Sequence, residues 1–286
     1  MSAVMIVAHH ERAEAAALAE LAASWLAERG HQAWMPPEDA SALGTPALAA
    51  ERSPSTADLV LSLGGDGTML RAINIIDGAA VPVIGVNVGL LGYLTEVEPP
   101  SMTAALERFL AGDYTVEQRM MLTVAIEPRP GLTGRVLGPW RALNEAVIER
   151  QESGHTVRLL VDIDGAPFTS YAADGLIMAT PTGSTAYSLS ARGPVVSPTH
   201  RALLLTPVSP HMLFDRSLVL DPDEDIAVEV IGHRPVALSL DGVRVAVLGE
   251  GDTVRCRAAD ERALFVRFGR RRFHQILKAK FGLSDR

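Results

Sequence analysis

The stretch of residues 59–68 constrains the fold of this chain more than any other. It starts with an apolar run of strand length, residues 59–63, and ends with the sequence Gly-Gly-Asp-Gly-Thr. The apolar positions of residues 69–76 then recur with the period of a helix. Glycines at such a corner allow positive φ angles and a close approach of the backbone to a ligand. The sequence therefore predicts a strand, a tight corner and a helix, with a ligand at the corner.

The carboxylate at this corner, Asp66, needs an explanation. The start of a helix offers free N–H groups and the positive end of a dipole, which favour an anion such as phosphate. A carboxylate repels phosphate, so Asp66 suits the corner if it accepts a proton from a hydroxyl group that attacks phosphorus, or if it holds a magnesium ion. The alternative is a tight turn with a helix cap and no ligand, because turns favour these residue types.

A second strand and a second glycine-rich corner follow. Residues 81–87 form an apolar run, and residues 89–93 read Gly-Leu-Leu-Gly-Tyr. Residues 3–35 show a further strand, helix and short strand, and residues 36–56 are interpreted as a surface connection. This alternation predicts a Rossmann-like α/β domain with a parallel sheet over residues 1–113. In such sheets the carboxyl ends of neighbouring strands line one crevice, where ligands bind.

The pattern changes after Asp113. The chain then consists of short strand-like segments separated by turns such as Asp164-Gly165. This predicts a β-rich domain over residues 114–265, built as a sandwich of two packed sheets. Residues 266–286 return to helical spacing, and we expect a C-terminal helix that packs on the N-terminal domain.

Composition limits the partners and the compartment. A chain of 286 residues can form two domains with a large core. The net charge of −8 argues against nucleic acid or an anionic membrane as a partner, so the basic run at residues 270–272 is interpreted as a solvated helix face. Cys256 is the only cysteine, which excludes a disulfide framework and a cysteine-built metal site. No signal-length or bilayer-length apolar segment is present, so the expected location is the cytoplasm.

The second informative stretch is residues 174–190. Asp-Gly leads into an apolar strand, and the sequence Thr-Pro-Thr-Gly-Ser-Thr-Ala-Tyr follows. Hydroxyl groups and free N–H groups at a helix start can hold phosphate or ribose oxygens, and Tyr187 can stack on a ring. A plain helix cap needs only one hydroxyl group. The three of Thr182, Ser184 and Thr185 therefore favour a ligand site over a cap.

Other polar pairs are less specific. Asn144-Glu145 is typical of a turn first and of a nucleotide contact second, in which the Asn side chain would donate and accept at a base edge and the carboxylate would accept from ribose hydroxyls. Asp241-Gly242 is typical of a hairpin turn first and of a ligand contact second. The adjacent His9 and His10 point different ways, so we expect no shared metal ion. Neither a GxGxxG fingerprint nor a Walker motif occurs, so a phosphoryl-transfer enzyme of this sequence is not built on a P-loop.

Taken together, these motifs resemble the NAD kinases. Residues 64–68, 87–94, 144–145 and 174–187 occur in the order and spacing of that family, and the resemblance extends to the closing residues 273–282. The Gly-Gly-Asp-Gly corner alone is also similar to corners in 6-phosphofructokinases and in diacylglycerol and sphingosine kinases. The long stretch with Thr-Pro-Thr-Gly-Ser-Thr-Ala-Tyr is what indicates an NAD kinase.

The resemblance implies that ATP, carrying Mg²⁺, phosphorylates the 2′-hydroxyl of the adenosine ribose of NAD to give NADP. It also implies an α/β domain and a β-rich NAD-binding domain with the site between them, in a homodimer or homotetramer. Asp66 matches the proton acceptor of the family, and no protein-built metal site is expected. The residues that match NAD contacts are Asp66, Gly67, Asn144, Glu145, His155, Asp174, Thr185, Ala186, Tyr187 and Ser190. The residues expected to hold phosphate are Gly64, Gly65, Thr68 and Arg71.

Three positions depart from the family pattern. Arg192 stands where the family usually has glycine, which costs about 1 kcal/mol if the position needs a positive φ; otherwise Arg192 reaches a phosphate. Val243 replaces a common glutamine after Asp241-Gly242. Ala172 replaces an arginine of some relatives, so acceptance of NADH or of polyphosphate as donor stays open.

Two other classes of function stay open at this point. A non-catalytic dinucleotide sensor would not need Asp66. A lipid kinase of the diacylglycerol type would share the first corner but would not need Asn144-Glu145 or the run at residues 174–187.

Overall fold

The computed structural model describes the chain except residues 90–91, 128, 130–136, 153, 270–272 and 284–286. The Leu90-Leu91 pair of the second corner and the basic run at residues 270–272 therefore lie outside the described residues. Within the described part of the chain, no helix is long and apolar enough to cross a bilayer.

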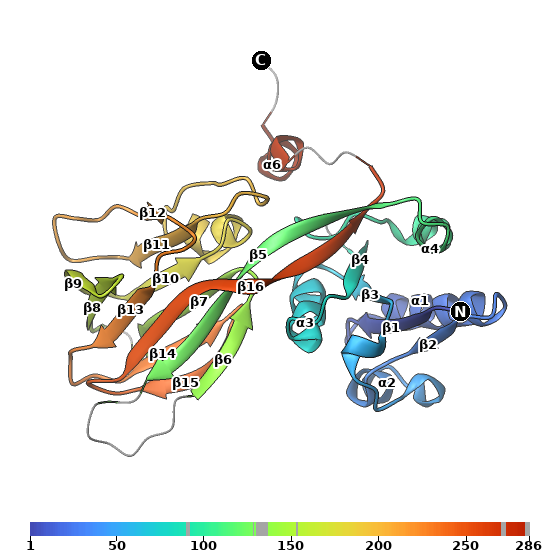
Figure 1. Cartoon of the computed structure of the whole chain (residues 1–286), viewed down its shortest axis with the longest axis horizontal. Helices are drawn as coiled ribbons and strands as arrows, with labels where there is room; N and C mark the ends of the chain where they lie inside the picture. The colour runs from blue at the N-terminus through green and yellow to red at the C-terminus, as the bar shows by residue number, and fades with distance from the viewer. Residues whose placement is uncertain (90–91, 128, 130–136, 153, 270–272, 284–286) are drawn as a thin grey trace. The chain divides into compact units, whose positions relative to one another are not determined.

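The chain forms two compact units, whose elements are labelled in Figure 1. Unit 1 consists of Met1–Gln118 and Ala263–Arg286, and unit 2 of Arg119–Arg262. The divisions fall inside two long strands, β5 (Thr115–Glu127) and β16 (Thr253–Arg267).

The sheet of unit 1 is parallel, with the strand order β2-β1-β3-β4 and the end of β16 beside β4. Every residue of β3 is buried, which explains the apolar run before the first corner. The predicted α/β domain is confirmed. Its elements are β1 (Ala3–Ala8), α1 (Ala13–Ala27), β2 (Gln32–Trp34), α2 (Pro37–Ala42), β3 (Leu59–Gly64), α3 (Asp66–Ile76), β4 (Pro82–Asn87), α4 (Met102–Leu110) and α6 (Phe273–Phe281), with 3₁₀ turns at Pro46–Leu48, Pro54–Thr56 and Pro99–Ser101.

The interpretation of residues 36–56 as a plain surface connection is wrong in its first part, because α2 forms there. A proline in the first turn has the φ that a helix start requires, and Glu38 and Asp39 suit the positive end of the helix dipole. Asp39 and Ala40 are buried. This helix therefore contributes to the interior of unit 1.

Unit 2 is a sandwich of two sheets, as predicted. In one sheet the order is β6-β5-β16-β13-β8-β9, and in the other it is β12-β11-β10-β7-β14-β15. Besides β5 and β16, its elements are β6 (Leu137–Ala142), β7 (Glu145–Arg150), β8 (Val157–Ile163), β9 (Ala166–Ala173), β10 (Gly175–Ala179), a 3₁₀ turn (Gly183–Thr185), α5 (Tyr187–Ser190), β11 (Leu203–Val208), β12 (Leu218–Leu220), β13 (Ile226–Val230), β14 (Val236–Leu240) and β15 (Val243–Leu248).

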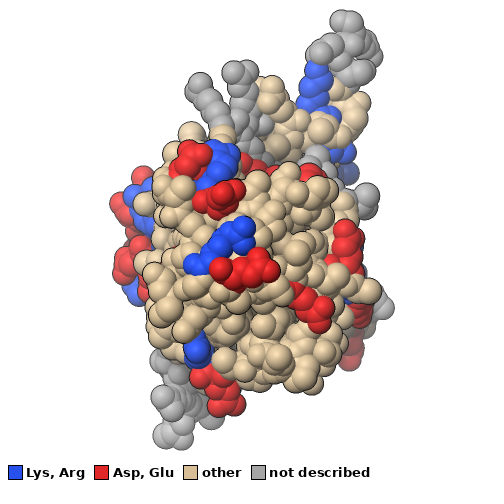
Figure 2. All heavy atoms as spheres, turned by 90° about the vertical axis from the view of Figure 1, so that its right-hand side faces the viewer, with Lys and Arg blue, Asp and Glu red and all other residues tan. Residues whose placement is uncertain are grey.

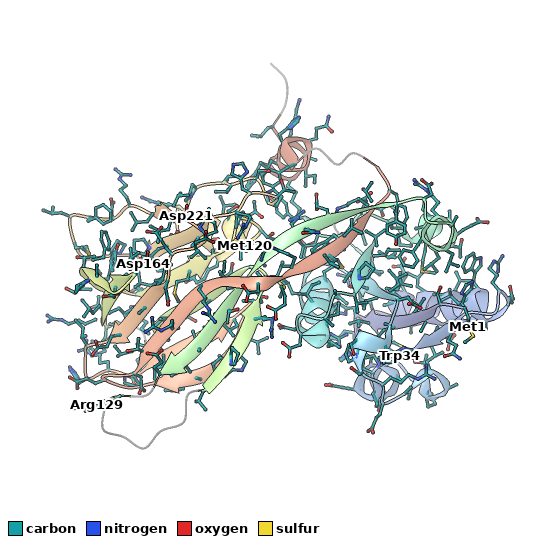
Figure 3. All side chains as sticks on the ribbon, in the orientation of Figure 1. Met1, Trp34, Met120, Arg129, Asp164 and Asp221 are labelled. Atoms are coloured by element: carbon teal, nitrogen blue, oxygen red, sulfur yellow. The ribbon has the colours of Figure 1, made fainter. Side chains whose placement is uncertain are left out.

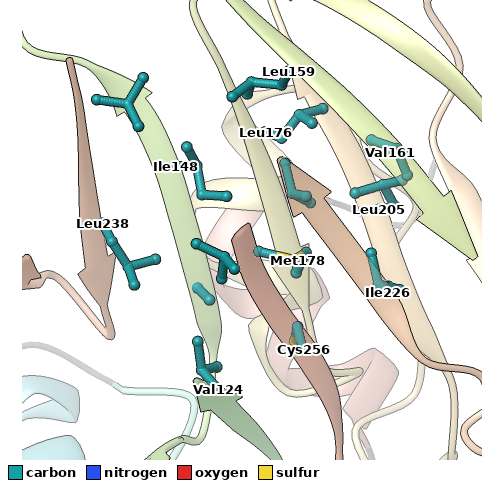
Figure 4. Packing of buried hydrophobic residues seen from close by; sticks show 14 of the residues in the cluster. Val124, Ile148, Leu159, Val161, Leu176, Met178, Leu205, Ile226, Leu238 and Cys256 are labelled. Carbon is teal, nitrogen blue, oxygen red and sulfur yellow. The ribbon is translucent and has the colours of Figure 1, made fainter. Parts of the chain in front are cut away.

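The core of unit 2 lies between these two sheets. Figure 4 shows apolar side chains of both sheets pointing into one space, among them Val161 and Ile226 from the first and Met178 and Leu238 from the second. Cys256 of β16 is fully buried among them. The single thiol is therefore part of the core.

The turn predicted at Asp164-Gly165 is confirmed. It joins β8 to β9, and both residues have positive φ angles, 51° and 77°, as a two-residue hairpin of this kind requires. Asp164 is labelled in Figure 3.

On the face drawn in Figure 2, acidic and basic side chains are interspersed among uncharged residues without a large patch of one sign.

Arg192, two residues after α5, has a φ of 65°. Its N–H donates to the carbonyl of Leu189 at 3.0 Å, and the N–H of Gly193 donates to the carbonyl of Ser188 at 2.8 Å, so the left-handed residue ends the helix. The position therefore needs the left-handed conformation that glycine adopts without a clash, and the arginine is strained.

We predict that Arg192→Gly raises the free energy of unfolding by about 1 kcal/mol, because glycine has no side chain to clash in this conformation. Urea denaturation followed by circular dichroism measures the change. The control is Arg192→Ala, which removes the charge but keeps a Cβ and should give little of this gain. An equal gain in both variants would assign the effect to the charge of Arg192 and contradict the strain.

Candidate functional site

The first corner is built on the junction of β3 and α3 in unit 1. Gly65 is the N-cap of α3 and has no side chain to bind the free N–H groups of the first turn. A Cβ on Gly64 would lie 2.1 Å from Oγ1 of Thr68, so the buried threonine requires glycine at this position. Asp66, the first residue of α3, is half-buried, and Gly67 is exposed.

The second corner holds the carboxylate of Asp66. Oδ2 accepts a hydrogen bond from the N–H of Tyr93 at 2.8 Å, and Oδ1 accepts one from the N–H of Leu94 at 2.9 Å. A Cβ on Gly92 would lie 2.3 Å from Oδ1, so only glycine leaves room for the carboxylate here. The sequence pattern indicated that the two corners share an edge, but not that one corner fixes the side chain of the other.

Arg71, expected to hold phosphate, binds the carboxylate of a residue outside every predicted motif. Its guanidinium pairs with both oxygens of Asp39 on α2 and donates to the carbonyl of Ala8 at 2.6 Å. Nε2 of His10 lies 3.0 Å from Oδ1 of the same carboxylate. Burial works to raise the pKa of Asp39, but the hydrogen bonds from Arg71, His10 and the N–H of Ala8 outweigh it, and the pKa is lowered. Asp39 thus keeps its charge and fixes Arg71.

In unit 2, Asp241 organises the pair Asn144-Glu145. Its carboxylate accepts hydrogen bonds from the N–H groups of Leu143 at 2.7 Å, Asn144 at 2.8 Å and Glu145 at 3.0 Å. Asp241 is also the turn residue between β14 and β15, with a φ of 47°. The predicted hairpin turn is therefore confirmed, and the same residue has a second, unpredicted role in holding the neighbouring loop.

The loop of the second motif packs on the same residues. Thr180 donates twice across this contact: its N–H donates to the carbonyl of Asn144 at 2.9 Å, and its hydroxyl donates to the carbonyl of Leu143 at 2.6 Å. A Cβ on Gly183 would lie 2.1 Å from the carbonyl oxygen of Asn144, so this glycine permits the close approach. The structure thus brings the two predicted motifs of unit 2 together.

Glu145 lies buried where these loops meet, with 6% of the residue exposed. Burial, and then the charge of Asp241, raise the pKa of Glu145 to about 8, while the N–H of Tyr187 acts to lower it. Among the described residues, Oε2 of Glu145 has no hydrogen-bond partner. A buried carboxyl oxygen in this state is suited to a ligand group.

Asp174 precedes β10, at the end of that strand opposite to Thr180 and Glu145. Asp174 pairs with Arg150 at 3.0 Å, and Arg150 donates to the carbonyl of His155 at 3.5 Å. Tyr187 and Ser190 are exposed and line a hollow of about 460 Å³ together with Arg192. Thr185 and Ala186 are half-buried in the turn before α5.

The raised pKa of Glu145 predicts a pH-dependent stability. Between pH 4.5 and about 8 the folded protein keeps a proton that the unfolded chain has lost. The free energy of unfolding should therefore fall as the pH rises through this window, and Glu145→Gln, which cannot ionise, should make the fall smaller. Urea denaturation at several pH values measures how the free energy of unfolding of each protein changes with pH. Equal changes in the natural protein and in Glu145→Gln would contradict the raised pKa of Glu145.

Family models cover most of the chain. A model described as ATP-NAD kinase N-terminal domain matches residues 4–114, and one described as ATP-NAD kinase C-terminal domain matches residues 143–268. An NAD kinase of Heliobacterium modesticaldum is 38% identical over 282 residues, covering 98% of each chain. One of Symbiobacterium thermophilum is 44% identical over 247 residues, covering 85% of this chain and 86% of the relative.

Two solved structures share the fold. A yeast NADH kinase complexed with NADH superposes with a TM-score of 0.87 at 24% identity, covering 100% of this chain and 89% of the other. An NAD kinase from Archaeoglobus fulgidus in complex with ATP gives a TM-score of 0.72 at 21% identity, covering 98% and 97%. With both family models and relatives above 30% identity in agreement, this chain belongs to the ATP-NAD kinase family.

Proposed function

We propose that the chain transfers the γ-phosphoryl group of ATP to the 2′-hydroxyl of the adenosine ribose of NAD, with Asp66 as the general base. Family membership supports the overall reaction, the formation of NADP from NAD. The observation that carries the role of Asp66 is its position: a half-buried carboxylate at the first residue of a helix, held through both oxygens by backbone N–H groups.

Phosphoryl transfer requires alignment, charge neutralisation and an acceptor for the hydroxyl proton. Each oxygen of Asp66 accepts one N–H, which leaves a lone pair on each for the ribose hydroxyl. As the bond between the ribose oxygen and phosphorus forms, the hydroxyl proton passes to Asp66. The bond from phosphorus to the bridging oxygen of ATP breaks, and ADP leaves with its electron pair.

Magnesium is proposed to arrive with ATP as part of the substrate. The described residues contain no group of three or more His, Cys, Asp or Glu side chains that could hold a metal ion by themselves. The phosphate oxygens are assigned to the backbone of Gly64 and Gly65 and to Thr68, because the uncapped start of α3 presents N–H groups there. Arg71 lies on α3, and its five N–H donors exceed the three hydrogen bonds that it makes to Asp39 and Ala8.

NAD is proposed to contact the residues that match the family pattern. The unpartnered Oε2 of Glu145 and the fixed main chain of Asn144 support an adenosine contact at this pair. The other proposed contacts are Gly67, His155, Asp174, Thr185, Ala186, Tyr187 and Ser190. An assay of NADP or NADPH formation, run with ATP or polyphosphate and with NAD or NADH, decides which donor and which acceptor the enzyme prefers. Light scattering decides between a homodimer and a homotetramer.

We predict that Asp66→Asn lowers kcat by roughly 10²–10⁴, the usual effect of losing a general base, while the KM for NAD changes little. An enzyme-coupled assay of NADP formation measures both constants. The control is Asp77→Asn at the other end of α3, where the left-handed conformation tolerates asparagine. Near-normal turnover of Asp66→Asn would exclude the proposed role.

A further inference from the structure

Arg267, at the end of β16, is buried with 5% of the residue exposed, and its guanidinium has three partners within unit 1. Nε and Nη2 donate to Oε1 of Glu117 at 3.1 and 2.8 Å. Nη1 donates to Oε2 of Glu96 and to the carbonyl oxygen of Leu94, both at 3.3 Å. The N–H of Phe268 adds a bond to Oε1 of Glu96 at 3.1 Å, so the end of β16 is tied to the segment that follows the second corner.

Leu94 is also one of the two residues whose N–H groups hold Asp66. Its carbonyl accepts from Arg267, and its N–H donates to Oδ1 of Asp66 at 2.9 Å. A residue fixed at both its N–H and its carbonyl has little freedom to rotate about φ and ψ. Leu94 therefore connects the guanidinium to the carboxylate through one residue of main chain.

The other N–H donor to Asp66 is contacted by the C-terminal helix. The ammonium group of Lys280 on α6 lies 4.2 Å from the ring centroid of Tyr93, a favourable cation–π distance. Both residues that bind Asp66 are thus contacted by side chains from the last part of the chain, within the same unit.

We propose that Arg267 is a positioning residue for Asp66, acting through the carbonyl of Leu94. The inference rests on the proposed role of Asp66 as the general base. The requirement is geometric rather than one of charge alone, because the planar guanidinium makes four hydrogen bonds from three separate nitrogens, whereas an ammonium group has three donors on a single nitrogen. A group that accepts a proton must be held close to the hydroxyl, and small displacements of it reduce turnover strongly.

The test is Arg267→Lys, made in the natural chain and in the Asp66→Asn variant. In the natural chain we expect kcat to fall about tenfold or more, with the KM values for NAD and ATP within about threefold. In the Asp66→Asn variant the same substitution should change kcat by less than about twofold, because the base that it positions is already absent.

Arg108→Lys is the matched control. The Arg108 guanidinium donates to the carbonyl of Phe268 at 3.1 Å and lies 4.9 Å from its ring, so it contacts the same segment of chain but not Leu94. The kcat of the Arg108→Lys variant should stay normal. If circular dichroism shows that Arg267→Lys does not fold, Glu96→Gln replaces it in both backgrounds. This substitution weakens the bond between Arg267 and Glu96 without changing the volume of the side chain.

The outcomes separate the two proposals. A loss of kcat of equal size in both backgrounds, a loss confined to KM, or a normal kcat in the natural chain would overturn the role of Arg267 and leave that of Asp66 intact. Near-normal turnover of Asp66→Asn by itself would overturn the general-base role, and the inference with it.

Discussion

The parallel pairing of β3 with β4 is the constraint on which the candidate site of unit 1 depends. Its register places Gly64 opposite Asn87, and the N–H of Val88 donates to the carbonyl of Gly64 at 3.0 Å. Both glycine-rich corners therefore start at the same edge of the sheet. Only from that edge can the main chain of the second corner reach the carboxylate at the start of α3.

In both units backbone N–H groups donate to a carboxylate, but the predicted site residues are the acceptor in unit 1 and the donors in unit 2. In unit 1 the main chain of Tyr93 and Leu94 holds a carboxylate, whereas in unit 2 the carboxylate of Asp241 holds the main chain of Asn144 and Glu145. Backbone N–H groups are present whatever the side chain, so in unit 2 these bonds set the position of Asn144 and Glu145 without using their side chains. The side chains are thereby left available for a ligand.

Much of this arrangement could be predicted from local pattern. The strand before Gly64 and the helix after it follow from an apolar run, a glycine corner and helical spacing, which are all short-range signals. In unit 2 the hydroxyl groups of residues 182–185 exceed what a cap requires and predict a ligand site, which stays a prediction, whereas Asn144-Glu145 by itself is equally compatible with a turn. The structure shows that the second motif packs directly on Asn144.

What could not be predicted depends on contacts between distant residues. Asp39 in a proline-rich segment gives no sign that it binds Arg71, thirty-two positions later. Asp241 is typical of a hairpin, and its bonds to residues about a hundred positions earlier have no local signal. The pattern change after Asp113 lies near the division in β5, but an unbroken strand gives no local signal for the residue at which one unit ends.

The burial of the single thiol gives unit 2 an internal reporter. Burial raises the pKa of Cys256 to about 12, so at neutral pH the sulfur is almost entirely protonated as well as sealed from solvent. The thiolate is the form that attacks an alkylating reagent, and the buried sulfur meets the reagent only when the core of unit 2 opens. The rate at which the native protein takes up such a reagent therefore measures how often the sandwich opens, without any introduced label.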